Sequence, residues 1–198
     1  MEQVNKAAQK RGRIGLLLVL AVCAAPIILS YLTYYVIKPT GRTNYGAILD
    51  PRMYPMPPLH STSLDGKPVG VDAYKGKWLL LTADTGACLE PCRKKLFEMR
   101  QLRLAQGKHM DRVERVWLIV DKEPLDTVLM REYDGTRMLR VSPEQLKLWL
   151  PTEAGTQVTD HMYVVDPLGN LMMRFPKDAD PNKIKKDLGK LLRASSIG

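Results

Sequence analysis

The chain has 198 residues, of which 45% are hydrophobic and 26% are charged. This balance excludes a disordered chain and a multi-span membrane protein, and the length suffices for one domain after an N-terminal segment. The formal net charge is +9, but the basic residues are spread along the chain without an arginine-rich block. The charge therefore argues against nucleic acid and favours anionic lipid or an acidic protein surface.

An uncharged apolar segment runs from Ile14 to Ile37, and its 24 residues exceed the roughly 20 that a membrane-spanning helix needs. The flank before it is basic, with one acid, and consists of Lys6, Lys10, Arg11, Arg13 and Glu2. We therefore expect a cytoplasmic tail over residues 1–13 and a single transmembrane helix over 14–37. The following domain is then expected outside the inner membrane, in the periplasm or an equivalent space.

A cleaved signal peptide and a lipoprotein anchor at Cys23 are the alternatives for this segment. The apolar run continues for eleven residues past Pro26, which is longer than a signal-peptide core requires. We therefore favour an uncleaved anchor, in which Cys23 is a small apolar side chain. Residues 38–58 are rich in Pro, Gly and Tyr without periodicity, and are predicted to be a linker.

The rest of the chain alternates short apolar strands with amphipathic helices. Residues 64–69 predict a hairpin with Asp-Gly at its turn. Two continuous apolar runs, 77–82 and 113–120, are typical of strands buried on both faces. Each is followed by a helical pattern, over 91–106 and 125–133 respectively.

The C-terminal part continues with a helix that opens at Ser142, where serine is the cap and proline follows it. Residues 162–165 and 171–175 predict a strand pair, and 181–192 predicts a closing helix. The order β-α-β-α, β-hairpin, α predicts an α/β fold over residues 59–198, with a central mixed sheet flanked by helices. Two cysteines at the end of the first central strand make this arrangement thioredoxin-like.

Those cysteines, Cys88 and Cys92, are four residues apart and therefore share one face of a helix. At a helix N-terminus the dipole lowers the pKa of a thiol. Nearby basic residues add to this field and acidic residues oppose it: Arg93, Lys94 and Lys95 against Asp84 and Glu90. In a redox pair, Cys88 would be the attacking thiol and Cys92 the resolving one. A structural disulfide or two inert thiols are the alternatives.

The domain resembles the SCO/SenC family of cytochrome c oxidase assembly proteins, as a divergent member. The resemblance covers residues 59–192 and rests on the order and spacing of several segments: Leu64-Asp65-Gly66-Lys67, Gly76-Lys77-Trp78-Leu79-Leu80, Val116-Trp117-Leu118-Ile119-Val120-Asp121, Asp126-Thr127-Val128-Leu129, Ser142-Pro143-Glu144-Gln145-Leu146, and Tyr163-Val164-Val165-Asp166-Pro167-Leu168-Gly169. The resemblance implies a thioredoxin-like domain that one helix holds at the membrane.

The resemblance also implies a copper site made of the two cysteines of a CxxxC motif and a distant histidine. Residues 88–92 keep the CxxxC spacing, although Leu89 and Arg93 stand where the family usually has proline. His161 is the nearby candidate for the third ligand, with Asp160 as a residue that orients its ring. The matching family position falls near Val158. His161 is alternatively a strand-edge histidine without a ligand role, and His60 and His109 are expected at the surface.

Two thiolates and one imidazole are a soft ligand set that suits copper. The resemblance implies an SCO-like assembly factor for cytochrome c oxidase that handles copper or reduces target thiols through Cys88 and Cys92. Such a protein is a metallochaperone or a thiol-disulfide oxidoreductase and not a classical enzyme. The expected partners are the lipid bilayer, through residues 14–37, and, as the resemblance implies, oxidase subunit II or another assembly factor. The alternatives are a thioredoxin-type oxidoreductase without copper and a non-catalytic assembly scaffold.

Overall fold

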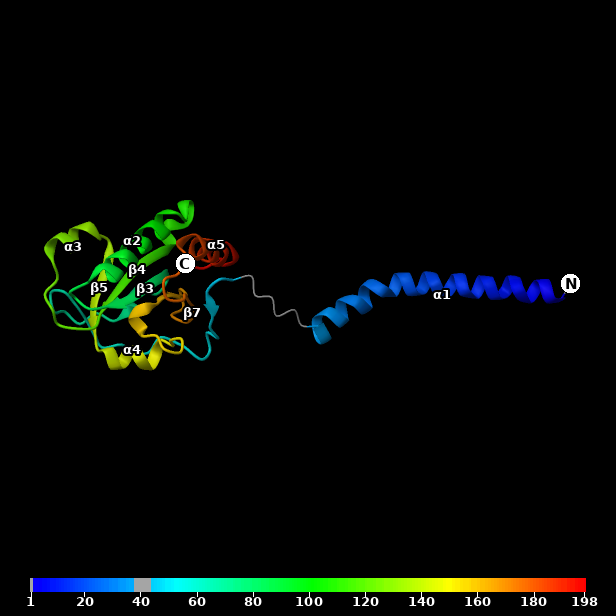
Figure 1. Ribbon diagram of the computed structural model, residues 1–198, viewed down its shortest axis with the longest axis horizontal. Helices are drawn as coiled ribbons and strands as arrows, with labels where there is room; N and C mark the ends of the chain where they lie inside the picture. The colour runs from blue at the N-terminus through cyan, green and yellow to red at the C-terminus, as the bar shows by residue number, and fades with distance from the viewer. Residues whose placement is uncertain (1, 38–43) are drawn as a thin grey trace. The chain divides into compact units, whose positions relative to one another are not determined.

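The computed structural model describes residues 2–37 and 44–198, and in the first range the side chains from residue 13 onward. The chain divides into two compact units, Met1–Thr43 and Asn44–Gly198. In the first unit, helix α1 (Glu2–Leu32) is continued by a short π-helix, η1 (Thr33–Ile37) (Figure 1). Across these two helices, the stretch Arg13–Ile37 is long and apolar enough to cross a membrane, in agreement with the predicted segment 14–37.

The second unit is built on a seven-stranded sheet with the order β1-β7-β6-β3-β4-β5-β2. Strands β3, β4 and β5 are parallel, whereas β6 runs antiparallel to β3 on its other side and β7 runs antiparallel to β6. The strands are β1 (Ala47–Ile48), β2 (Ser61–Ser63), β3 (Trp78–Asp84), β4 (Val113–Ile119), β5 (Thr136–Val141), β6 (Met162–Val165) and β7 (Leu171–Arg174).

Helices cover both faces of this sheet, so alternate residues of each central strand enter different cores. On one face, α2 and α5 pack over Leu80, Trp117 and Val164, and on the other face α4 packs over Leu81 and Leu118 (Figure 1). The helices are α2 (Glu90–Leu104), α3 (Thr127–Glu132), α4 (Pro143–Trp149) and α5 (Pro181–Ala194), and three 3₁₀ turns are η2 (Val71–Tyr74), η3 (Gly107–Arg112) and η4 (Val158–Asp160). The predicted thioredoxin-like α/β fold is confirmed.

Two details of the sequence interpretation differ from the structure. The predicted linker 38–58 is too long, because β1 pairs with β7 and the backbone around Tyr54 bonds to Leu171. Extended chain at a sheet edge needs no apolar periodicity to be held by backbone hydrogen bonds. Strand β5 was missed because its sequence, TRMLRV, mixes arginines with apolar residues. Residues 38–43 of the predicted linker lie outside the described residues.

Candidate redox site

The turn that carries Cys88 joins the end of β3 to the start of α2 and is held from the neighbouring parallel strand. The backbone N–H of Gly86 donates to both carboxylate oxygens of Asp121, at 2.9 and 3.0 Å. Asp121 follows shortly after β4, so the two C-terminal strand ends meet here. A Cβ atom at position 86 would lie 2.8 Å from the carbonyl oxygen of Glu123, so this approach requires glycine.

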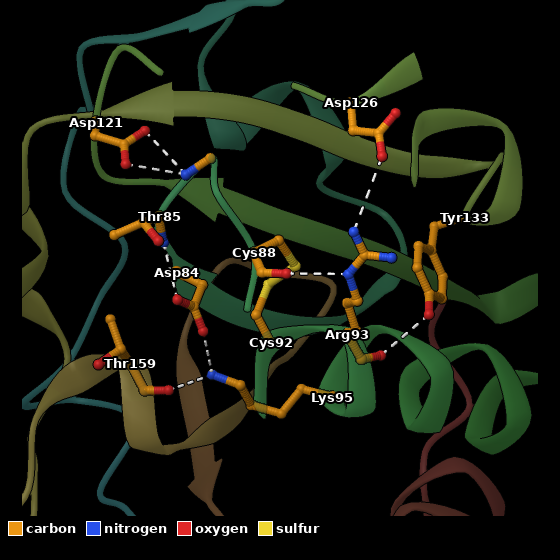
Figure 2. Close-up of a disulfide and its surroundings, with 11 residues drawn as sticks. Asp84, Thr85, Cys88, Cys92, Arg93, Lys95, Asp121, Asp126, Tyr133 and Thr159 are labelled. Carbon is orange, nitrogen blue, oxygen red and sulfur yellow. Dashed lines mark hydrogen bonds and ion pairs between the residues drawn. A yellow bond between two sulfur atoms is a disulfide. The ribbon is translucent and has the colours of Figure 1, made fainter. Parts of the chain in front are cut away.

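Cys88 and Cys92 form a disulfide across the first turn of α2, with their Cα atoms 5.0 Å apart (Figure 2). Cys88 has a positive φ of 38°, a left-handed conformation that non-glycine residues rarely adopt. Both side chains are buried, with exposures of 0% for Cys88 and 1% for Cys92, and they belong to the core between the sheet and α2. The sequence-predicted pair is therefore brought together as a disulfide.

Arg93, which directly follows Cys92 in the first turn of α2, fixes the backbone of the disulfide loop. Its Nε donates to the carbonyl oxygen of Cys88 at 3.3 Å, and its Nη2 lies 3.9 Å from a carboxylate oxygen of Asp126. The hydroxyl of Tyr133 donates to the carbonyl oxygen of Arg93 at 3.2 Å (Figure 2). Arg93 thus connects the disulfide loop to both ends of α3, because Asp126 precedes this helix and Tyr133 follows it.

Lys95, also in α2, connects this helix to the end of β3 and to η4. Its Nζ lies 2.8 Å from a carboxylate oxygen of Asp84, at the end of β3, and also donates to the carbonyl oxygen of Thr159 in η4 (Figure 2). The ion pair is mostly buried, with side-chain exposures of 12% and 18%. The sequence indicated Lys95 only as a contributor of positive field, because its contact with η4 is non-local.

A cleft with a volume of about 280 Å³ opens beside the disulfide, between α2, η4 and the segment after β7. Cys92 lines this cleft together with Met162, the first residue of β6, whereas Cys88 is not among its lining residues. The cleft also carries both signs of charge, from residues that include Lys94, Glu98 and Asp178. Cys92, although only 1% exposed, is therefore the cysteine of the pair that borders the cleft.

Glu98 is a buried carboxyl group in this cleft, with an exposure of 9%. Burial raises the pKa of Glu98 above its ordinary value of 4.5, and Asp178 adds to this, while Lys94 and Lys95 oppose it. A raised carboxyl pKa means that the ionised form is disfavoured in the folded state. The charge on Glu98 therefore destabilises the fold at neutral pH, and this cost disappears as the pH falls and the carboxyl is protonated.

We accordingly expect Glu98→Gln to raise the free energy of unfolding at about pH 7.5, well above the ordinary carboxyl pKa. The gain should shrink as the pH is lowered and should be absent well below pH 4.5, where the carboxyl is neutral in both states. Chemical denaturation across this pH range measures the effect. Glu90→Gln, an exposed change at the start of the same helix, is the matched control and should show no such gain. Equal curves for the two variants would contradict the expectation.

His161, the predicted third copper ligand, is fully buried and uses both of its ring nitrogens. Its Nδ1 lies 2.8 Å from the carbonyl oxygen of Phe175, and because a carbonyl can only accept, Nδ1 is the donor. Its Nε2 lies 2.7 Å from the hydroxyl oxygen of Thr156. The imidazole thus connects the end of β7 to the loop before η4.

The strand alternation of β6 separates His161 from the cysteines. Met162 and Val164 belong to the same core as Cys88 and Cys92, whereas Tyr163 belongs to the opposite core. His161 has extended backbone angles directly before the strand, and its ring packs edge-on against Tyr163 at 6.0 Å between centroids. Its side chain therefore lies on the Tyr163 side of the sheet, and Met162 is the residue that faces the cysteines.

Among residues 13–37 and 44–198, no three His, Cys, Asp or Glu side chains gather in an arrangement that could hold a metal ion. The predicted set of Cys88, Cys92 and His161 is thus not assembled. Asp160, predicted to orient the histidine ring, instead accepts from the backbone N–H of Gln157 and pairs with Lys177. His60 is exposed, as expected, and the Nδ1 atom of His109 lies 3.3 Å from Nη1 of Arg112.

The fold and the disulfide at the β3–α2 junction place the protein in the thioredoxin-like class. Residues 78–195 match the family described as "Transmembrane-like, thioredoxin-like, C-terminal domain", and residues 6–36 match "Transmembrane-like, N-terminal domain". The chain belongs to this family of transmembrane-like proteins with a thioredoxin-like C-terminal domain. No curated protein matches it by sequence.

Solved structures with a similar fold include SCO proteins and thiol-disulfide oxidoreductases. Arabidopsis thaliana ScoI with copper bound is 22% identical, with a TM-score of 0.52 over 70% of this chain and 100% of that one. An SCO1/SenC family lipoprotein from Bacillus anthracis is 17% identical, with a TM-score of 0.54 over 73% and 99%. A thiol:disulfide interchange protein from Bacteroides sp. is 18% identical, with a TM-score of 0.51 over 72% and 91%. The predicted resemblance to SCO/SenC proteins is confirmed at the level of the fold.

Proposed function

We propose that the domain exchanges disulfides with thiols of a protein partner through Cys88 and Cys92, while α1 holds it at a membrane. The observation that carries this proposal is the disulfide at the β3–α2 junction, with Cys92 lining a cleft. A thiolate of the partner attacks the Cys92 sulfur, the disulfide breaks, and Cys88 leaves as a thiolate that takes up a proton. A second partner thiolate then displaces Cys92, so the partner is oxidised as the pair becomes a dithiol; the reverse sequence reduces the partner.

The short loop argues against a purely structural disulfide. The two cysteines are four positions apart in the sequence. Closing so small a loop in the unfolded chain stabilises a fold by only about 2 kcal/mol on the chain-entropy estimate. A disulfide in this place is therefore better explained by its chemistry than by its contribution to stability.

A polypeptide fits the site better than a small thiol as the reaction partner. A second cleft of about 660 Å³ lies next to the first and shares Asp84, Thr85 and Thr159 with it. Its lining includes the apolar side chains of Leu146 and Leu150. An extended peptide could place a cysteine beside Cys92 and a neighbouring apolar side chain in the second cleft.

Copper fits the cysteines but not the predicted third ligand. The reduced pair would supply two thiolates, which are good ligands for Cu(I). His161 has no free ring nitrogen in this structure and lies on the other side of β6. Copper bound in the solved ScoI structure supports testing the metal here, but we derive no step that passes through copper.

The setting that we propose follows from the anchor and from the resemblance. The basic residues before the membrane segment favour a cytoplasmic N-terminus and a domain in the periplasm or an equivalent space. Such spaces are oxidising and suit a protein with a disulfide. Maturation of cytochrome c oxidase is the process that the SCO/SenC resemblance suggests, with subunit II or another assembly factor as the partner.

A redox titration of the full-length chain in detergent tests the proposal. In glutathione buffers, with thiols counted by alkylation and mass spectrometry, Cys88 and Cys92 should convert reversibly between disulfide and dithiol. The midpoint should lie above about −300 mV, since structural disulfides lie below that value. The double variant Cys88→Ser/Cys92→Ser retains only Cys23 and therefore gives the number of alkylated thiols that Cys23 contributes. A pair that stays oxidised at lower potentials would establish a structural disulfide and favour a scaffold role.

A further inference from the structure

Helix α5 presents a strongly basic outer surface. Lys183, Lys185, Lys186 and Arg193 are exposed. Its only acid, Asp187, is 2% exposed and turns inward, and Lys190 pairs with it at 3.3 Å. A helix with one apolar face packed on the core and an outer face of lysine and arginine is a pattern that binds anionic membrane surfaces.

The chain enters the domain on this same helix. The backbone N–H groups of Tyr45 and Gly46 donate to one carboxylate oxygen of Asp187, at 2.6 and 2.9 Å. The hydroxyl of Tyr45 accepts from the backbone N–H of Asp180, the cap of α5, at 3.2 Å. The ammonium of Lys183 lies 5.0 Å from the centre of the Tyr45 ring. The attachment point of the membrane tether is therefore built into α5.

The sequence leaves little chain between the membrane segment and that attachment point. The apolar segment ends at Ile37 and Asn44 opens the domain. Even a fully extended chain spans only about 25 Å between these two residues. When the apolar segment is in a bilayer, the basic helix next to the attachment point is kept within reach of the lipid headgroups.

A hollow in the basic surface offers room for a headgroup. A cleft of about 300 Å³ lies between α5 and the chain after α2, lined by residues that include Lys185, Lys186 and Arg193. None of the described residues that line it is acidic. Gly189 forms part of its lining, and a Cβ there would lie 3.2 Å from Nη1 of Arg193 and 3.4 Å from Oε1 of Gln106. Glycine weakens a helix interior, and at this position it leaves space that a side chain would fill.

We propose that the basic surface of α5, formed by Lys183, Lys185, Lys186, Lys190 and Arg193, docks on the phosphate groups of anionic lipids in the membrane that holds the anchor. The occupant is a lipid surface, because the tether attaches at this helix and the surface is cationic. Docking gives the domain one preferred face toward the bilayer and thereby a defined approach for protein partners to the disulfide. The proposal does not depend on the redox function of Cys88 and Cys92.

Lysine acetylation of the full-length chain in lipid nanodiscs tests the docking. Nanodiscs of phosphatidylcholine alone are compared with nanodiscs that also contain phosphatidylglycerol, and mass spectrometry gives the rate at each lysine. Lys185 and Lys186 should react about five-fold more slowly in the anionic nanodiscs, which corresponds to the attraction of one lysine to an anionic surface. Lys67, an exposed lysine in the hairpin after β2, is the internal control and should react equally in both. High salt should abolish the difference.

Two further arms distinguish docking on lipid from unspecific adsorption and from the binding of a small anion. In the double variant Lys185→Glu/Lys186→Glu, Lys183 should be acetylated at the same rate in both kinds of nanodisc. In Lys67→Glu, the acetylation of Lys183 should remain slower in the anionic nanodiscs. Equal rates at Lys185 and Lys186 in both nanodiscs would overturn the proposal and leave a solvated helix surface. Equal protection at Lys67 would also overturn it, because the adsorption would then be unspecific. Protection by inorganic phosphate in phosphatidylcholine nanodiscs would indicate a small-anion site in place of lipid docking.

Discussion

Replacement of His161 by alanine is expected to lower the free energy of unfolding by about 2–4 kcal/mol. The imidazole is fully buried, so its removal leaves a cavity. The carbonyl oxygen of Phe175 loses the ring N–H that donates to it, and the hydroxyl of Thr156 loses its contact with the ring but keeps its hydrogen bonds with Glu153. Denaturant unfolding of the full-length chain in detergent, followed by tryptophan fluorescence, measures the change. His60→Ala removes an exposed imidazole and is the matched control, with an expected change within about 0.5 kcal/mol.

The same variant decides whether His161 is a metal ligand. If the reduced pair binds Cu(I), the affinity of the folded His161→Ala chain should equal that of the unaltered chain, because the imidazole lies on the opposite side of β6 from the cysteines. Copper affinity is measured by competition with a Cu(I) chelator under conditions where both chains are folded. Unchanged stability together with a loss of copper affinity would return His161 to the ligand set.

The two single cysteine variants are expected to differ in reactivity, in the order opposite to the sequence interpretation. With Cys23 replaced by alanine throughout, Cys88→Ser keeps the Cys92 thiol, which is 1% exposed but borders the cleft, and should form a mixed disulfide faster than the other variant. Cys92→Ser keeps only Cys88, which is buried like Cys92 but does not line the cleft, so it reacts only after a larger local opening of the site. An opening that costs only about 1.4 kcal/mol already slows the reaction about ten-fold.

The rates of reaction with an aromatic disulfide, measured by the release of its chromophore, test this order. The chain without cysteines gives the background, and unfolding curves of both variants show whether each is folded. Faster reaction of Cys92→Ser would restore Cys88 as the attacking thiol, as the sequence suggested. Equal rates in denaturant, where both thiols are free, are required for the comparison to report on the folded site.

The alternation of apolar runs and amphipathic helices was enough to predict the fold class, because a strand buried on both faces and a helix with one apolar stripe are local patterns. The segment Arg13–Ile37 was predictable for the same reason, since its length and its lack of internal charge are properties of consecutive residues. The position of Cys88 and Cys92 also followed from order alone, because they come shortly after β3 and open α2.

The extent of the domain could not be derived in this way. Residues 44–58 lack periodicity, yet they are held by hydrogen bonds to β7 and, at Tyr45, to Asp187. Strand β5 gave a weak signal because its arginines make contacts outside the apolar core, such as Arg140 with the carbonyl oxygen of Asp121. These contacts join residues that are distant in sequence, and their donors and acceptors have no local signature.

Local sequence patterns were sufficient to predict a thioredoxin-like domain with a cysteine pair after an apolar segment. The residues that surround that pair could be identified only from contacts between strands and helices that are distant in the sequence. A shift of one residue along an extended strand moves a side chain to the other face of a sheet, so Met162 faces the cysteines while the neighbouring His161 lies with Tyr163. Tertiary packing also puts Cys92 and not Cys88 at the cleft, although both are buried, and turns Asp187 inward so that the exposed charges of α5 are all basic.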